Sequence, residues 1–137
     1  MHQLHFDWKY SYRYSPSGGA PAPLVPLRLR LGEYQVDFLA LLDTGAEQTL
    51  LDGVHLRAAG IDIFSGNERR FQGFLGAGTV AYEHPSTLTI ENLEVHLPIA
   101  YSSFPIGRQV MGRDLMAHFG IALREQVMEF WLTPEHT

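Results

Sequence analysis

Residues 38–51, with the sequence FLALLDTGAEQTLL, decide the fold class of this chain. The apolar run 38–42 is typical of a buried strand, and Asp43 follows it directly. A carboxylate beside Leu41 and Leu42 is costly unless it is paired, hydrogen-bonded or protonated. The Asp-Thr-Gly triplet therefore allows two interpretations, a turn capped by the Asp43 side chain or a catalytic acid. The triplet alone does not decide between them, because three common turn residues often coincide.

A second segment, residues 109–120 with the sequence QVMGRDLMAHFG, combines an apolar strand, a glycine and a short helix about seventy positions after Asp43. Together, and in this order, the two segments resemble the retropepsins, the homodimeric aspartic proteases of retroviruses and their stand-alone cellular relatives. The resemblance covers about residues 25–132. It implies that Asp43 is the catalytic acid and that a helix at residues 112–116 packs beneath the active-site loop.

The same resemblance gives supporting roles to the residues that follow Asp43. It implies that the Thr44 hydroxyl braces two active-site loops across a dimer axis, and that Gly45 lets substrate approach the backbone closely. Ala46 belongs to the same loop. Glu47 is expected to form an ion pair with Arg113, whose planar guanidinium can hold a carboxylate in bidentate fashion. If this pair is buried, removal of Arg113 should cost about 3–5 kcal/mol of stability.

A glycine-rich stretch, residues 72–79 with the sequence QGFLGAGT, corresponds to the flap that closes over substrate in the retropepsins. Glycine permits tight turns and a close approach of the backbone to a ligand. We therefore predict a mobile hairpin with Gly76 and Gly78 at or near its tip. Its substrate-binding residues are expected to be Gly73, Gly76, Ala77 and Gly78.

Catalysis of the retropepsin type needs two aspartates that share a proton. The chain contains Asp-Thr-Gly once, and its 137 residues suit one domain without a second lobe. An isologous C2 dimer brings Asp43 of one copy next to Asp43 of the other at the axis. The resemblance thus implies a homodimer that acts on peptide or protein substrates.

The rest of the chain is dominated by a period of two, which is the signal of strands. Residues 1–15 are interpreted as an aromatic amphipathic strand, 16–24 as a loop and 25–132 as the protease domain. The aromatic side of the first strand is expected to pack on the core or on a partner chain rather than to bind a ligand.

Further elements are expected from local patterns. Residues 27–31 and 36–42 should form a hairpin, and strand-like stretches recur at 71–82, 86–90 and 94–101. Short helices are predicted at 54–59, ended by Gly60, and at 113–119, ended by Gly120. We predict a mostly β fold, a retropepsin-like closed barrel or sandwich of short strands with one short C-terminal helix, which forms a homodimer.

Composition excludes several classes of protein. The absence of cysteine excludes disulfides, thiolate catalysis and Cys-ligated zinc. A net charge of -5 with scattered arginines indicates no nucleic-acid partner. The chain starts without the pattern of a secretory signal and has no apolar run of membrane-spanning length, so we expect no membrane partner and a cytoplasmic location.

We expect neither a metal nor a cofactor. The seven histidines are dispersed, without the spacing that places two imidazoles on one helix face. Residues 76–81 match a dinucleotide-binding glycine pattern, but a β-branched stretch up to Pro85 replaces the helix that such a site requires. Asp114 lies in the first turn of a predicted helix, where the dipole alone explains an acid, and it is interpreted as structural.

Two functions therefore remain for the chain. The first is hydrolysis of peptide bonds by a pair of Asp43 residues in a homodimer. The second is a catalytically silent dimer of the same fold that binds peptides or organises a complex, because a fold does not guarantee its usual activity. The intact Asp-Thr-Gly favours the first function, since Asn or Ser would cap the same turn equally well.

Overall fold

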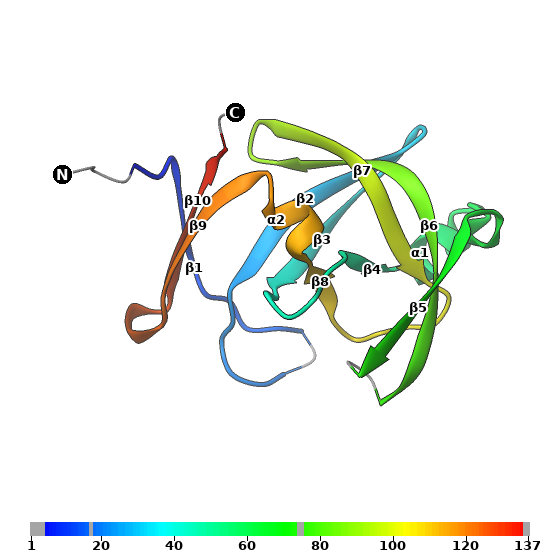
Figure 1. Ribbon diagram of the computed structural model, residues 1–137, viewed down its shortest axis with the longest axis horizontal. Coiled ribbons are helices and arrows are strands. Elements are labelled where there is room, and N and C mark those ends of the chain that lie inside the picture. The colour runs from blue at the N-terminus through cyan, green and yellow to red at the C-terminus, as the bar shows by residue number, and fades with distance from the viewer. Residues whose placement is uncertain (1–4, 17, 74–75, 136–137) are drawn as a thin grey trace.

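The computed structural model describes residues 5–16, 18–73 and 76–135, without the side chains of residues 72–77. Within these ranges the chain is mostly β, as predicted, and the strands form two sheets (Figure 1). The strands are β1 (Trp8–Ser11), β2 (Leu24–Leu31), β3 (Tyr34–Leu42), β4 (Leu50–Asp52), β5 (Asn67–Gly73), β6 (Gly76–Ile90), β7 (Leu93–Ser102), β8 (Gln109–Met111), β9 (Phe119–Arg124) and β10 (Glu129–Pro134). The helices are α1 (Val54–Ala58) and α2 (Arg113–Met116), with 3-10 turns η1 (Ile63–Ser65) and η2 (Glu125–Val127).

Six strands close into a barrel. Their order is β2-β3-β8-β4-β7-β6, and β6 pairs with β2 to complete the ring. The interior is filled by apolar side chains that alternate with exposed ones, for example Leu27 and Leu29 on either side of Arg28 in β2. β5 pairs with the first half of β6, from Gly76 to Glu83, and projects from the barrel (Figure 1). The predicted closed barrel is confirmed.

The hairpin expected before Asp43 is also confirmed. β2 and β3 pair antiparallel from Leu24↔Leu41 to Leu31↔Tyr34. Gly32 lies in the connecting turn with a φ of 61°, a left-handed conformation that glycine adopts without steric cost.

The two segments quoted from the sequence meet at one end of the barrel. β3 and β8 run parallel, and Leu42 lies opposite Met111. Parallel pairing places the carboxyl ends of both strands side by side. Asp43, which follows β3, is therefore next to Gly112, which follows β8.

β1, β10 and β9 form a separate three-stranded sheet, seen at the left of Figure 1. The regular first strand is shorter than the predicted span of residues 1–15, of which residues 1–4 lie outside the described ranges. Its aromatic side packs on the core as expected, with Tyr10 stacked on Phe130 at a centroid distance of 4.9 Å. The Tyr10 hydroxyl donates to Glu91 at 2.6 Å, and burial together with this contact raises the pKa of Tyr10.

The second predicted helix is wrong in its extent. α2 ends at Met116, whereas Phe119 and Gly120 belong to β9 and pair with β10. A Cβ on Gly120 would lie 3.1 Å from the Thr133 side chain, so this glycine serves close strand packing rather than a helix cap. The pairing of β9 with β10 outweighs the local helix pattern.

The first predicted helix is close to the observed one. α1 ends at Ala58, and Gly60 follows with a φ of 87°, as expected for a glycine after a helix. α1 packs on the barrel through the fully buried Leu56. In the described ranges, no helix has the length and apolar character needed to cross a membrane.

Candidate active site

Asp43 is half-buried on the loop between β3 and β4. Its N–H donates to the Met111 carbonyl at 3.2 Å, so β8 fixes its backbone. Its Oδ1 accepts the Gly45 N–H at 2.9 Å, and the Ala46 N–H donates to the Asp43 carbonyl at 3.1 Å. The turn-capping interpretation is thus correct for the local geometry. It does not exclude catalysis, because a carboxylate has about four acceptor positions and the Gly45 N–H occupies one.

The other predicted loop residues lie beside Asp43. In the single chain Thr44, Gly45 and Glu47 are exposed, whereas Ala46 is half-buried. A Cβ on Gly45 would lie 3.2 Å from Asp43 Oδ1, so a side chain there would press on the acid. The structure brings residues 43–47 together on one exposed loop, and their roles across a dimer axis remain predictions.

α2 supports this loop from below, where the start of a helix has N–H groups without partners in the helix. The Arg113 N–H donates to the Ala46 carbonyl at 2.9 Å, and the Asp114 N–H donates to the Glu47 carbonyl at 3.2 Å. A Cβ on Gly112 would lie 2.4 Å from the Gln48 carbonyl carbon, so only glycine fits between helix and loop.

Thr49 and Asp114 fasten the loop to the helix, and sequence reasoning did not identify Thr49. Asp114 Oδ1 accepts the Thr49 N–H at 2.9 Å, the Thr49 hydroxyl at 2.7 Å and the Leu115 N–H at 2.7 Å. Thr49 Oγ1 in turn accepts the Gly112 N–H at 3.0 Å, and Thr49 is fully buried. The interpretation of Asp114 as a structural acid fits these contacts. Its carboxylate binds the N–H of Leu115 at the start of the helix and, beyond that expectation, also binds Thr49.

The predicted ion pair between Glu47 and Arg113 is present but weak. Arg113 Nη2 lies 3.7 Å from Glu47 Oε1, and the side chains are 57% and 89% exposed in the single chain. The condition of burial attached to the expected 3–5 kcal/mol is not met here. Exposed pairs of this kind contribute less than about 1 kcal/mol.

A cleft of about 580 Å³ opens beside Asp43. One wall is the active-site loop with Gln48 and Leu50, and the opposite wall comes from β5. The β5 residues in this wall, which the sequence did not single out, are Arg69, Arg70 and Phe71. The cleft therefore combines an apolar side chain, Phe71, and two cations, Arg69 and Arg70, with the Asp43 carboxylate.

The predicted flap corresponds to the hairpin of β5 and β6. Gly73 pairs with Gly76 at its end, and residues 74–75 between them lie outside the described ranges. The stretch 71–82, expected as one strand-like run, thus folds back on itself. Gly78 is exposed near that end. Binding of substrate by Gly73, Gly76, Ala77 and Gly78 remains a prediction.

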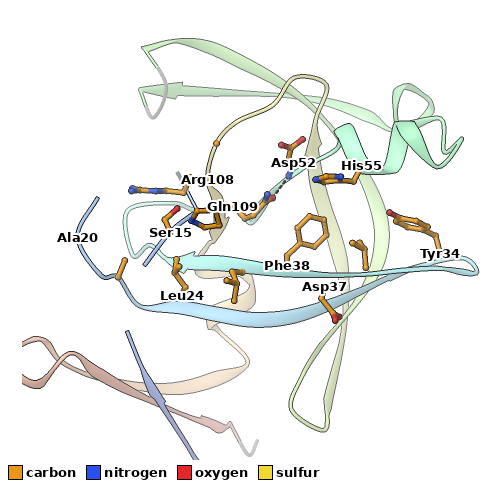
Figure 2. Close-up of a pocket in the computed structure, with 15 residues that line it drawn as sticks. Ser15, Ala20, Leu24, Tyr34, Asp37, Phe38, Asp52, His55, Arg108 and Gln109 are labelled. Atoms are coloured by element: carbon orange, nitrogen blue, oxygen red, sulfur yellow. Dashed lines mark hydrogen bonds between the residues drawn. The ribbon is translucent and has the colours of Figure 1, made fainter. Parts of the chain in front are cut away.

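A slightly larger cleft of about 630 Å³ shares no lining residue with the Asp43 cleft. Figure 2 shows it above the β2–β3 hairpin, with Phe38 on the hairpin side and Asp52 and His55 on the opposite side. Gln109 Oε1 accepts the Asp52 N–H at 2.5 Å, and Asp52 Oδ1 caps the start of α1 at 2.9 Å. Asp52 is buried, at 9% exposure, whereas Asp43 is only half-buried, so the geometry favours Asp43 as the acid that is open to a ligand.

No group of three or more His, Asp or Glu side chains in the described part of the chain is arranged to hold a metal ion. The functional groups at the site are the Asp43 carboxylate and the backbone N–H of Gly45, beside an open cleft.

Comparison with known proteins gives the family. The family model described as retroviral aspartyl protease matches residues 20–124. The chain belongs to the retroviral aspartyl protease family. No curated protein sequence matches it.

Among solved structures, this family member is similar to the retropepsin-like aspartic protease from Rickettsia conorii, with 14% identity over 96% of both chains and a TM-score of 0.58. It is also similar to the EIAV protease complexed with the inhibitor HBY-793, with 18% identity over 70% of this chain, 86% of that chain and a TM-score of 0.48. The Rickettsia structure confirms the retropepsin-like fold.

The family match takes in the whole barrel and β9 but leaves out β1 and β10. The likeness to the Rickettsia structure covers 96% of the chain and therefore extends beyond the family match. Asp43 and Gly112, at the ends of β3 and β8, lie inside the matched residues.

Proposed function

We propose that this chain is an aspartic endopeptidase in which two copies pair around a C2 axis and the two Asp43 carboxylates activate a water. The observation that carries the proposal is the setting of Asp43. The acid is fixed by the Met111 carbonyl and by its own turn, and it borders an open cleft. An aspartate that only caps a turn does not need a cleft, whereas a catalytic acid does. Membership of the family supports the same conclusion.

The chemistry follows from two acids in close proximity. One carboxylate keeps a proton while the other is ionised, because two negative charges at this distance cannot both persist. The ionised Asp43 takes a proton from the water, and the protonated one polarises the peptide carbonyl. The water oxygen bonds to the carbonyl carbon, and as the C–N bond breaks the leaving nitrogen accepts the proton that Asp43 took from the water. No covalent enzyme intermediate is required.

A homodimer supplies the second acid. The exposed Thr44 and Gly45 lie directly after Asp43, on the surface that a second copy would cover. The substrate is an extended peptide that lies between this loop and the β5–β6 hairpin. Phe71 provides an apolar wall for its side chains, and the flap glycines allow its backbone to approach.

The test is incubation of the purified protein with a broad peptide library at mildly acid and neutral pH. Asp43→Asn is the matched control, because its amide oxygen can still accept the Gly45 N–H but the side chain cannot ionise. Cleavage should disappear in the variant while its circular dichroism and melting temperature stay at the wild-type values. Cleavage by the variant would contradict the proposal. Peptide binding without cleavage by the wild type would favour the silent binding module.

A further inference from the structure

A half-buried carboxylate links the base of the flap hairpin to the active-site loop. Glu83, on β6, is 12% exposed, and its Oε2 accepts Gln48 Nε2 at 2.6 Å. The same oxygen lies 3.3 Å from Arg69 Nε of β5. We call these three residues the Glu83 anchor. Gln48 and Arg69 both line the Asp43 cleft, so the anchor connects the loop side of the cleft to its β5 side.

Both ends of the anchor are themselves held in place. Gln48 precedes Thr49, whose N–H and hydroxyl are bound by Asp114. Glu83 pairs with Asn67 on one side and with Ala100 on the other, which makes it part of the regular sheet. If the hairpin base moved relative to the loop, Gln48 would therefore stay with the loop, and its hydrogen bond to Glu83 would break.

A small apolar cluster lies at the same place. Leu50, Ala81, Ala100 and Ile106 are buried together, with Phe71 packed against them, apart from the main core of the barrel. This small cluster gives little resistance to a change in the angle between the β5–β6 hairpin and the active-site loop, because apolar packing is non-directional. Hydrogen bonds to a charged acceptor are directional and stronger than neutral ones.

We propose that Glu83 is a positioning residue that sets the distance between the flap base and the Asp43 loop, and with it the width of the substrate cleft. It acts through Gln48 and Arg69 and does not touch the reacting atoms. This inference rests on the proposed peptidase function for its kinetic consequence, but its structural consequence is independent of catalysis. Substrate binding depends on the anchor, and the chemical step at Asp43 does not.

The first measurement is amide hydrogen exchange of residues 67–83 in the protein without ligand. Glu83→Met keeps the length of the side chain but removes both acceptor contacts, so exchange there should rise about tenfold. Glu83→Gln keeps an oxygen for Arg69 and an amide that can bond to Gln48, so it should restore part of the protection. Glu94→Gln removes an exposed carboxylate on β7, paired with Arg30 at 3.6 Å, and should leave exchange at residues 67–83 unchanged.

The second measurement is the kinetics of peptide cleavage. Glu83→Met should raise KM about tenfold with kcat within about twofold of wild type. The KM of Glu83→Gln should lie between those of wild type and Glu83→Met. Unchanged exchange at residues 67–83 in a folded Glu83→Met protein would overturn the anchor even if the wild type cleaves peptides. A wild type that cleaves nothing would end the peptidase proposal, and the exchange result would still decide the anchor.

Discussion

Arg113 and Asp114 are charged neighbours on α2, but their side chains differ in how strongly they hold the active-site loop. The Asp114 carboxylate accepts three hydrogen bonds beneath the active-site loop, two of them from the fully buried Thr49. The Arg113 side chain extends into solvent and approaches the exposed Glu47 at 3.7 Å. Burial and the number of donors, rather than charge, decide which residue holds the loop. The underside of the loop is fixed, and its upper side is open around Asp43.

The largest effect is expected where the helix meets the loop. Gly112→Ala would place a Cβ 2.4 Å from the Gln48 carbonyl carbon and 2.8 Å from the Thr49 nitrogen, and backbone atoms cannot move away cheaply. We expect a loss of about 3 kcal/mol or more in the free energy of unfolding, measured in urea at fixed protein concentration.

The control for this variant is Gly78→Ala. Its Cβ would have an ordinary contact of 3.6 Å with the Phe71 carbonyl, so its stability should change by less than about 1 kcal/mol. Equal effects of the two substitutions would show that helix and loop are not in tight contact.

Asp114→Ala should have the next largest effect. It leaves the buried Thr49 N–H and hydroxyl without their acceptor, which costs about 2–3 kcal/mol of stability. Asp114→Asn keeps one acceptor oxygen and should cost less. If the alanine variant were as stable as wild type in urea, the loop would not depend on this carboxylate.

Arg113→Ala should have the smallest effect. The exposed pair with Glu47 contributes less than about 1 kcal/mol, and this contribution should shrink as salt is added. The Arg113 N–H still donates to Ala46 in the variant, so the helix keeps its hold on the loop. A loss as large as that of Asp114→Ala would reverse the comparison between the two residues.

Much of the fold could be predicted because the signals were local. Alternation of apolar residues gave the β2–β3 hairpin, and the resemblance carried by the two motifs gave the packing of the 112–116 helix beneath the Asp43 loop. The extent of α2 was wrong because Phe119 and Gly120 fit a short helix pattern until β10, a distant segment, pairs with them. Strand pairing between distant segments leaves little trace in a local pattern.

The same reason applies to the site. Asp43 and the loop after it were found because their motif is contiguous in the sequence. Thr49 and Glu83 carry no motif, and their importance comes from burial next to donors on other elements. The sequence analysis expected Arg113 to stabilise the loop, whereas the structure gives this role to Asp114. A sequence shows which residues carry charge, but not which charged side chains are buried.

In the proposed enzyme one chain supplies only half of the catalytic pair. This can be tested by the peptidase activity of wild type mixed with excess Asp43→Asn chains and allowed to exchange partners. At nine variant chains to one wild-type chain, random pairing predicts that activity per wild-type chain falls to about one tenth, because mixed dimers carry one acid and one amide. Activity that stays proportional to the wild-type chains alone, together with full activity of a monomer at high dilution, would contradict the shared pair.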